Sequence, residues 1–441
     1  MSGIERRTLL KAIGAAGAAG VLAACSSDGD GDGGGATSTG TGALSGTATF
    51  TTWANDQEAK AFNKIAADFK AARGAEIKIE VLPYDQIRTV VDRRLQANEA
   101  PDLFRVSYTD VGSYAANGVL ADLRNYMDDS FGDAFLPALW QAVQFEGKPI
   151  GVPHHTDTSA LVYNKAHFDK AGITSVPATL DQAWTWEQFT DVLRKLKAAN
   201  PGVAPFAFNY QLFGAYRWFN TLYQAGGSLL DDALEKPALD SPQTRKALEF
   251  TRSLYTEGLH APSVLVKRPT YPDEIFPTQK ISMIQAGDFL IPSIDGAVKD
   301  KFEWGVTYLM RDAGAATDLG GNAVVVTDGA KNPDVAAEFA KFLVTKENMQ
   351  AFCEQTTVLP VRTDLTNAKL AYASRPDLMP VFQQQATTMP AGLVKAATSP
   401  AFAGINQALI DTMDQYLSTP SASTDKAVQD LTAGVQKALQ A

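Results

Sequence analysis

The apolar residues of this chain change their spacing in a regular way, and this alternation limits the folds that it can adopt. Ile77, Ile79 and Val81 alternate as in a strand, and residues 47–53 read in the same way. Between these two segments, apolar residues recur at helical spacing as far as Gly74. Alternating strands and helices of this length predict an α/β fold with a largely parallel sheet.

The ends of the predicted strands carry side chains that suit a binding site. Trp53 and Asn55 follow the first strand, and Ser107 and Tyr108 follow a strand predicted over residues 101–106. In sheets of this kind, ligands bind outside the carboxyl ends of the strands. We therefore expect these side chains to lie near a ligand.

The N-terminal segment has the composition of an export signal. Arg6, Arg7 and Lys11 precede an apolar run, residues 12–24, that is too short to span a bilayer as a helix. The run ends in Leu-Ala-Ala-Cys, which resembles a bacterial lipobox and predicts a signal peptide over residues 1–24 with lipidation of Cys25. A plain secretory signal with an incidental cysteine is the alternative. The arginine pair resembles a twin-arginine signal, although Sec signals also begin with arginines.

The segment after the signal predicts a tether to the membrane. Residues 25–45 are almost all Gly, Ser, Thr, Asp and Ala, a composition typical of flexible linkers. The formal net charge of −10 argues against nucleic acid as a partner, because nucleic acid requires basic patches. The only cysteines are Cys25 and Cys353, so a lipidated Cys25 leaves no intramolecular disulfide. Cys353 has the helical spacing of a buried thiol.

Residues 151–165, Gly-Val-Pro-His-His-Thr-Asp-Thr-Ser-Ala-Leu-Val-Tyr-Asn-Lys, resemble the first hinge crossing of a known family. That family is the family 1 extracellular solute-binding proteins, the maltose-binding protein superfamily. Segments 116–123, 280–289, 320–339 and 359–362 resemble further motifs of the family and occur in its order. Each motif alone is weak, but together they extend over nearly the whole chain after the signal.

The resemblance implies a two-lobed periplasmic-binding-protein fold of type II, with a ligand cleft between lobes built from discontinuous segments. The first lobe would comprise residues 46–156 and 316–355, and the second lobe residues 157–315 and 356–441. It further implies a monomeric, lipid-anchored subunit of an ABC importer at the extracytoplasmic face of a bacterial membrane, with the permease subunits as partners.

A carbohydrate is the ligand that the candidate residues suit best. A sugar presents C–H faces and pairs of hydroxyls, so its site needs aromatic surfaces and planar hydrogen-bonding groups. Phe289 stands where the family usually has tryptophan. Core packing, hinge bracing, an ion pair between lobes or a simple turn are alternative roles for several of the candidates. The predicted ligand contacts are Trp53, Asn55, Tyr108, His155, Asp157, Trp218, Asp288, Phe289, Gly320, Gly321 and Arg362.

Other functions have less support in the sequence. A surface-anchored carbohydrate-active enzyme would also use aromatic and carboxylate side chains, but we identify no acid–base pair, nucleophile elbow, Walker loop or zinc motif. The four histidines lack the spacing of metal ligands, so we expect no metal site and no cofactor. Among binding proteins, a polyamine, a ferric ion or a glycerophosphodiester is the alternative to a carbohydrate.

Overall fold

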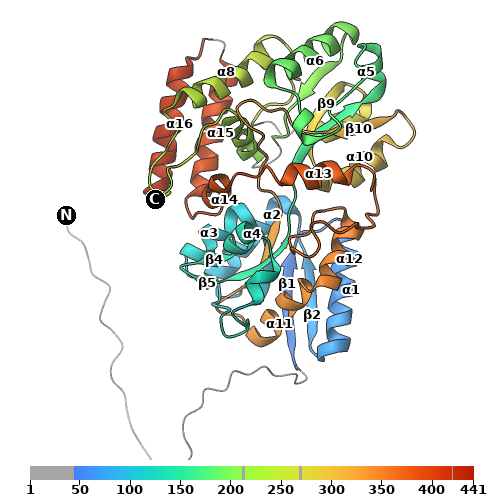
Figure 1. Ribbon diagram of the computed structural model, residues 1–441. Coiled ribbons are helices and arrows are strands. Elements are labelled where there is room, and N and C mark those ends of the chain that lie inside the picture. The colour runs from blue at the N-terminus through green and yellow to red at the C-terminus, as the bar shows by residue number, and fades with distance from the viewer. Residues whose placement is uncertain (1–43, 211–213, 268–270, 420) are drawn as a thin grey trace, which may run out of the picture. The chain divides into compact units, whose positions relative to one another are not determined.

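Two mixed β-sheets with helices packed on them organise the computed structural model (Figure 1), which describes residues 44–210, 214–267, 271–419 and 421–441. The described residues all belong to one compact unit. The predicted signal, with its two arginines and Cys25, lies outside the described residues, as does most of the predicted tether. At the end of that tether, the N–H of Leu44 already donates to the carbonyl of Arg73 (2.8 Å).

The first sheet has five strands in the order β2-β1-β3-β11-β6, and the second has four in the order β10-β7-β9-β8. A two-stranded ribbon, β4-β5, stands apart from both. The strands are β1 (Thr47–Thr52), β2 (Glu76–Val81), β3 (Leu103–Ser107), β4 (Gln144–Phe145), β5 (Lys148–Pro149), β6 (Gly151–His155), β7 (Ser159–Asn164), β8 (Ala204–Ala207), β9 (Ile281–Gly287), β10 (Trp304–Thr307) and β11 (Asn322–Val326).

Helices fill the connections between the strands. The α-helices are α1 (Asp56–Arg73), α2 (Tyr84–Gln96), α3 (Tyr108–Ala116), α4 (Pro137–Gln141), α5 (Lys165–Lys170), α6 (Trp186–Ala199), α7 (Phe219–Gln224), α8 (Pro242–Thr256), α9 (Pro272–Ile275), α10 (Ile291–Val298), α11 (Pro333–Leu343), α12 (Lys346–Thr356), α13 (Met379–Ala386), α14 (Ala391–Ala397), α15 (Phe402–Ser418) and α16 (Thr424–Leu439). The short 3₁₀ helices are η1 (Phe131–Ala134), η2 (Leu180–Gln182), η3 (Gly214–Trp218), η4 (Phe276–Thr278) and η5 (Asp288–Leu290). Among the described residues, none of these helices combines the length and the apolar character that a membrane span requires.

The first sheet is less parallel than the sequence suggested. β1 pairs in parallel with β2 and β3, as strand–helix alternation predicts, but β11 is antiparallel to both of its neighbours, β3 and β6. Asn322, at the start of β11, pairs with Ser107 and His155, the last residues of β3 and β6. The chain thus returns from the second sheet at the carboxyl edge of the first, and from there it can only run backwards.

Helix α1 packs on the first sheet and shows why the local sequence forms a helix. Asn55 caps it by accepting from the N–H of Glu58, whose side chain accepts from the N–H of Asn55 in return. Gly74 ends the helix with a left-handed φ of 88°. Phe62 lies on the buried face of α1, with its ring 5.3 Å from the ring of Phe50 on β1. Figure 1 shows α12 against α1 on this side of the sheet.

The chain passes between the two sheets where β6 leads into β7, at residues 156–158, and again where β10 leads into β11, at residues 308–321. A third passage comes later than residue 356, where the resemblance placed the boundary. Thr156 and Leu359 exchange backbone hydrogen bonds of 2.9 and 3.1 Å, and the carbonyl of Val361 accepts from the N–H of Leu136. The chain reaches the second sheet at Arg375, whose guanidinium lies 4.4 Å from the ring centre of Trp304 on β10, and α13 then contacts β7.

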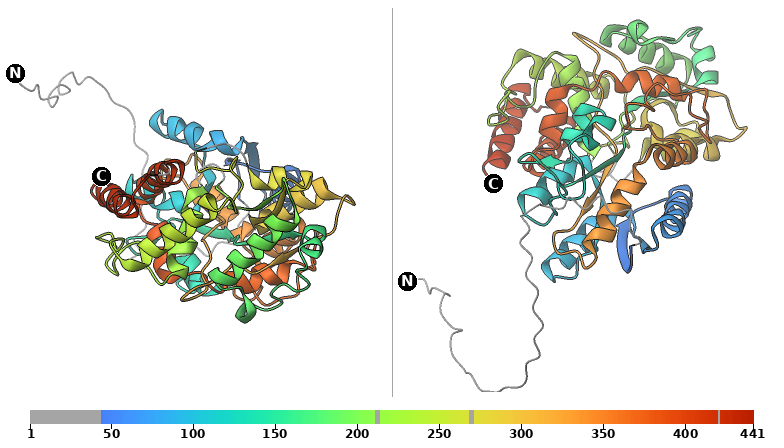
Figure 2. Two further views of the ribbon diagram at one scale, coloured as in Figure 1. Left: turned by 90° about the horizontal axis from the view of Figure 1, so that it is seen from above. Right: turned by 60° about the horizontal axis from the view of Figure 1, so that its bottom comes forward.

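Helices α15 and α16 lie side by side in both views of Figure 2. Helix α15 contacts α8, which belongs to the second sheet's segments, and also α3, which follows β3 of the first sheet. It therefore forms a wall that both sheets share. Cys353 on α12 is a buried free thiol, which confirms its prediction as a packing residue.

Candidate functional site

A cavity of about 710 Å³ lies at the carboxyl ends of β1, β3 and β6, with α15 as a further wall. This volume is within the range of small-molecule pockets. The start of α2 and η3 also contribute to it, so residues from segments on both sides of the crossings line one space. The position follows from the topology, because the carboxyl ends of the three strands meet at one edge of the sheet.

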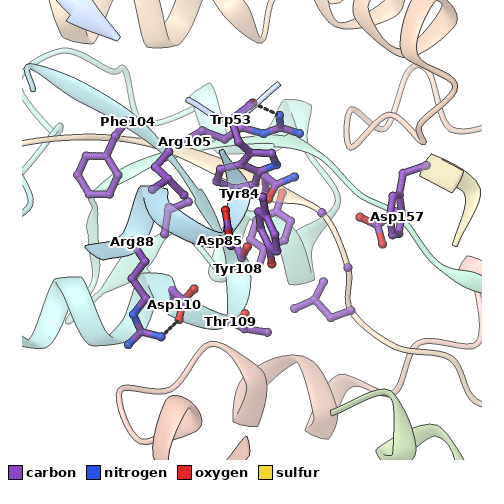
Figure 3. A pocket seen from close by; sticks show the side chains of 18 of the residues that line it. Trp53, Tyr84, Asp85, Arg88, Phe104, Arg105, Tyr108, Thr109, Asp110 and Asp157 are labelled. Carbon is purple, nitrogen blue, oxygen red and sulfur yellow. Dashed lines mark hydrogen bonds and ion pairs between the residues drawn. The ribbon is translucent and has the colours of Figure 1, made fainter. Parts of the chain in front are cut away.

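Two aromatic rings form a corner in this cavity. The ring centroids of Trp53 and Tyr84 lie 5.2 Å apart with an angle of 66° between the planes, and Figure 3 shows them next to each other. Tyr84 is 49% exposed although it has a large aromatic ring. Flat aromatic surfaces open to a cavity suit the C–H faces of a ligand. Tyr84 was missed in the sequence, where only its place after Pro83 at the start of a helix marks it.

Asp157, in the first crossing, is one of the acidic residues that line this space, together with Asp85 and Asp110 (Figure 3). It is only 7% exposed, and burial raises its pKa to about 6. The positive charge of Arg217 opposes the rise, and the negative charge of Asp318 adds to it. The N–H of Gly321 donates to the Asp157 carboxyl, which favours its ionised form.

The side of the cavity that belongs to the second sheet's segments carries an arginine. Arg217 in η3 is 7% exposed, and its Nε lies 3.5 Å from Oδ2 of the buried Asp318. Its guanidinium lies 5.0 Å from the ring centroid of Tyr216, which is half-buried and also lines the cavity. Guanidinium and carboxylate groups are planar, and each can form hydrogen bonds with two neighbouring hydroxyl groups of a ligand.

The two crossing segments meet beside the cavity at a pair of glycines. The N–H of Gly320 donates to the carbonyl of Asp157 (3.2 Å), and the hydroxyl of Thr156 donates to the carbonyl of Gly320 (3.1 Å). Gly321 has a φ of +95°, and a Cβ atom there would lie 2.4 Å from the carbonyl oxygen of His155. The glycines are thus required by the close approach of the two segments.

The sequence model of the family described as bacterial extracellular solute-binding protein matches residues 53–350. The chain belongs to this family. The prediction drawn from the hinge-like motifs is thereby confirmed.

Named relatives and solved structures agree with this assignment. The diacetylchitobiose binding protein DasA of Streptomyces coelicolor is 26% identical over 370 residues, which cover 80% of this solute-binding protein and 82% of DasA. The maltotriose-binding protein of Pyrococcus abyssi is 24% identical over 348 residues, 74% of this chain and 69% of its own.

The fold comparison gives the same result. The structure of the GacH receptor of Streptomyces glaucescens, known unliganded and in complex with acarbose, superposes with a TM-score of 0.76 at 22% identity. The match covers 90% of this solute-binding protein and 99% of the receptor. The maltotriose binding protein of Thermus thermophilus superposes with a TM-score of 0.70 at 22% identity, over 89% and 99% of the two chains. The predicted type II fold is therefore confirmed.

The structure brings eight of the eleven predicted ligand contacts of this solute-binding protein to the cavity. Several of them have their polar groups engaged. Asn55 uses Oδ1 to cap α1, which leaves its Nδ2 group for a ligand. The N–H groups of the glycine pair bond to Asp157, so they are not free to donate to a ligand. The eight residues are Trp53, Asn55, Tyr108, His155, Asp157, Phe289, Gly320 and Gly321.

Trp218 is not one of the cavity residues. Its side chain is 0% exposed, and its indole N–H donates to Oγ1 of Thr251 on α8 (2.9 Å). The turn of η3 directs Tyr216 and Arg217 to the cavity and the next residue into the core. The aromatic cluster around residue 216 therefore reaches the cavity as expected, but through Tyr216 and Arg217, whereas the predicted contact, Trp218, is buried in the core.

Asp288 and Arg362 also lie away from the cavity lining. Asp288 is 0% exposed and is joined to the first crossing, since its Oδ1 accepts from the N–H of Thr158 (2.7 Å). Burial and the neighbouring Asp157 raise its pKa well above the usual value. Arg362 bonds to Asp364 (3.0 Å) and to the carbonyl of Val344 (3.2 Å). Both side chains hold the backbone of this solute-binding protein rather than face its cavity.

Within the described part of the chain, no three histidine, cysteine or acidic side chains are grouped as metal ligands. The cavity offers aromatic surfaces, hydrogen-bonding groups and charges, in a space lined from both sides of the crossings.

Proposed function

We propose that this solute-binding protein captures a mono- or oligosaccharide in the cavity and delivers it to the permease of an ABC importer. The observation that carries the proposal is the aromatic corner of Trp53 and Tyr84, open to a cavity that also presents carboxylates and guanidinium groups. The names of DasA and of the maltotriose-binding protein support a carbohydrate, because each is named for an oligosaccharide ligand.

Capture would work by closure around the ligand. Trp53 follows a strand of the first sheet, whereas Arg217 follows a strand of the second, and both line the cavity. A ligand that touches both sides gains its full set of contacts only when the sides approach. It therefore selects the closed arrangement, and the crossings at residues 156–158 and 308–321 would serve as the hinge.

Membrane attachment forms part of the same proposal. After export by the twin-arginine or the Sec route, lipidation of Cys25 would hold the protein at the extracytoplasmic face of the membrane, near its permease. The protein would act there as a monomer. The support is the Leu-Ala-Ala-Cys sequence behind an apolar run. Cys25→Ser should release the protein from the membrane fraction, and retention of the variant in that fraction would contradict the anchor.

A ligand panel tests the binding function. Thermal unfolding of the purified protein is measured with mono- and oligosaccharides, spermidine, ferric ion and a glycerophosphodiester. A ligand that binds only the folded state adds about 3 kcal/mol at a hundredfold excess over its dissociation constant. We expect stabilisation by one class of sugar, with the sugar recovered unchanged after incubation. Stabilisation by a non-sugar alone would replace the ligand class, and a cleaved sugar would indicate an enzyme.

A further inference from the structure

Arg105 is a charged residue in an otherwise apolar strand, and it lies directly behind the aromatic corner. It is the third residue of β3 and is only 3% exposed, between Phe104 and Val106, which are buried as well. Burying a guanidinium group costs free energy unless ion pairs and hydrogen bonds replace its water. The partners of Arg105 therefore show what the residue is for.

The first set of partners holds Trp53 by two independent contacts. Nη1 of Arg105 donates to the carbonyl oxygen of Trp53 (2.9 Å), and the guanidinium carbon lies 4.5 Å from the centre of the indole ring. A guanidinium at this distance over an indole is a cation–π contact, which fixes the plane of the ring. Figure 3 shows Arg105 beside Trp53 at the wall of the cavity. Glu58 balances the charge, since its Oε1 accepts from Nη2 at 2.8 Å.

The second set of partners belongs to the ends of the crossings. Asn322 begins β11, directly after the second crossing, and its Oδ1 accepts from Nη2 of Arg105 (3.1 Å) and from Nε2 of His155 (3.0 Å). Its Nδ2 donates to the carbonyl of Gly321 (3.1 Å). The opposite amide orientation would direct an NH₂ group at two donors, so this orientation satisfies every partner. His155 ends β6, directly before the first crossing.

The protonation of His155 agrees with this network. Its Nδ1 lies 3.0 Å from Nδ1 of His154, so one of the two nitrogens must carry the proton. When Nε2 of His155 donates to Asn322, Nδ1 of His155 accepts and His154 donates. Burial and the nearby Arg105 charge lower the pKa of both rings, which keeps them neutral. Arg105 is then the single positive charge of the cluster.

We propose that Arg105 is a positioning residue of the ligand site, which fixes the Trp53 ring for stacking and joins it to the ends of both crossings through Asn322. This inference rests on the proposed function, because it assigns Arg105 a role in ligand affinity through Trp53. A residue of purely structural importance would lower stability but would have no specific link to Trp53.

A double-mutant cycle separates the two roles. Arg105→Met keeps the length of the side chain and removes the charge, and Trp53→Ala removes the ring. We expect Arg105→Met to weaken binding of the sugar found in the ligand panel about three- to thirtyfold, the range of a lost cation–π contact. In the Trp53→Ala background the same substitution should change the dissociation constant less than about twofold. Equal losses in both backgrounds would overturn the inference.

A matched control comes from the second arginine–tryptophan stack at this distance. The guanidinium of Arg375 lies 4.4 Å from the ring centre of Trp304 and bonds to Asp377 (2.8 Å), and neither ring nor guanidinium lines the cavity. Arg375→Met should leave the dissociation constant unchanged. An equal loss of affinity in this control would show that removing any such stack disturbs binding, which contradicts a specific role for Arg105.

Two additions keep the test decisive if Arg105→Met does not fold or if no sugar is bound. Because Arg105→Met leaves Glu58 buried without a partner, Arg105→Lys and the double variant Arg105→Met/Glu58→Gln are made in parallel. Tryptophan fluorescence then provides a measurement that needs no ligand. The emission of Trp53 is obtained as the difference between each protein and its Trp53→Phe version. We expect stronger acrylamide quenching of this emission without Arg105. Unchanged quenching in the folded variants would overturn the inference, whereas absence of any bound sugar in the wild type would contradict the proposed function alone.

Discussion

A Cβ atom on Gly320 would lie 1.8 Å from Oδ1 of Asp157, so the two crossing segments touch where only a glycine fits. The contact joins a buried acidic residue of the cavity lining to the backbone of the second crossing. The contact thus connects two of the segments by which the chain passes between the sheets. Four expectations follow from this contact and from the packing around it.

Gly320→Ala should displace the Asp157 carboxyl and destabilise the protein. Overpacking of a buried contact costs about 1 to 3 kcal/mol, and the added methyl group meets a side chain that is 7% exposed. Urea unfolding measures the change. Gly314→Ala lies on the same connecting segment, where an added Cβ meets nothing within 4 Å. It should unfold at nearly the wild-type midpoint, and equal losses in both variants would show that the contact does not matter.

Glu58→Ala should cost more stability than its surface counterpart. Glu58 pairs with Arg105, whose side chain is 2% exposed, and losing one partner of a buried pair costs about 3 to 5 kcal/mol. Glu80 pairs with Arg94, both side chains being about 30% exposed, so Glu80→Ala should cost about 1 kcal/mol or less. Denaturant titration of the two variants gives the comparison. A similar cost for both would mean that Arg105 is well solvated.

The stability that Asp157 contributes to the protein should decrease as pH rises from about 4 to about 6. Asp157 has a pKa of about 6 in the folded protein and about 3.9 when unfolded, so the folded state binds the proton more tightly. Through Asp157 the folded state therefore loses up to about 3 kcal/mol of stability across this interval. Asp288 shifts in the same direction, so the two carboxyls titrate as a pair.

Asp157→Asn should flatten the pH dependence of the unfolding free energy in this interval. The control is Asp122→Asn. The hydrogen bond from Arg124 lowers the pKa of Asp122, so the contribution of Asp122 to stability is lost as pH falls rather than as it rises. Denaturant unfolding at several pH values measures the slopes. A slope that Asp157→Asn leaves intact would assign the titration to another group.

Trp53→Ala and Trp218→Ala should impair different properties of the protein, ligand binding and stability respectively. Trp218 is fully buried, so its truncation should cost about 3 to 5 kcal/mol of stability. Trp53 is partly exposed in the cavity, so its loss should mainly weaken ligand binding, which calorimetry measures with the sugar identified by the panel. Loss of binding in a stable, folded Trp218→Ala variant would restore that residue as a ligand contact.

The sequence predicted the local elements well, because local periodicity determines them. Residues 77–81 were expected as a strand, and β2 covers Glu76–Val81. The antiparallel direction of β11 could not be predicted, since it depends on where the chain returns to the first sheet. The position of the third passage could not be predicted either. It lies after residue 359 because backbone hydrogen bonds between Thr156 and Leu359 hold this part of the chain at the first crossing.

The candidate site was predictable where strand ends form it. Trp53 and Tyr108 lie at the cavity because they follow β1 and β3. Tyr84 and Arg217 were missed, because only tertiary packing brings the start of α2 and η3 to the same space. A signal for Arg105 was present, since a charged residue in a buried apolar strand requires partners.

The place of β11 in the interior of the first sheet has a consequence for how the protein is made. β11 separates β3 from β6 in the sheet, although the whole second sheet lies between β6 and β11 along the chain. Until residues 322–326 have been synthesised, β3 and β6 both have an open edge and no shared partner. Such distant pairing is slow to form. A growing chain therefore cannot complete its first sheet until the segments of the whole second sheet have been synthesised.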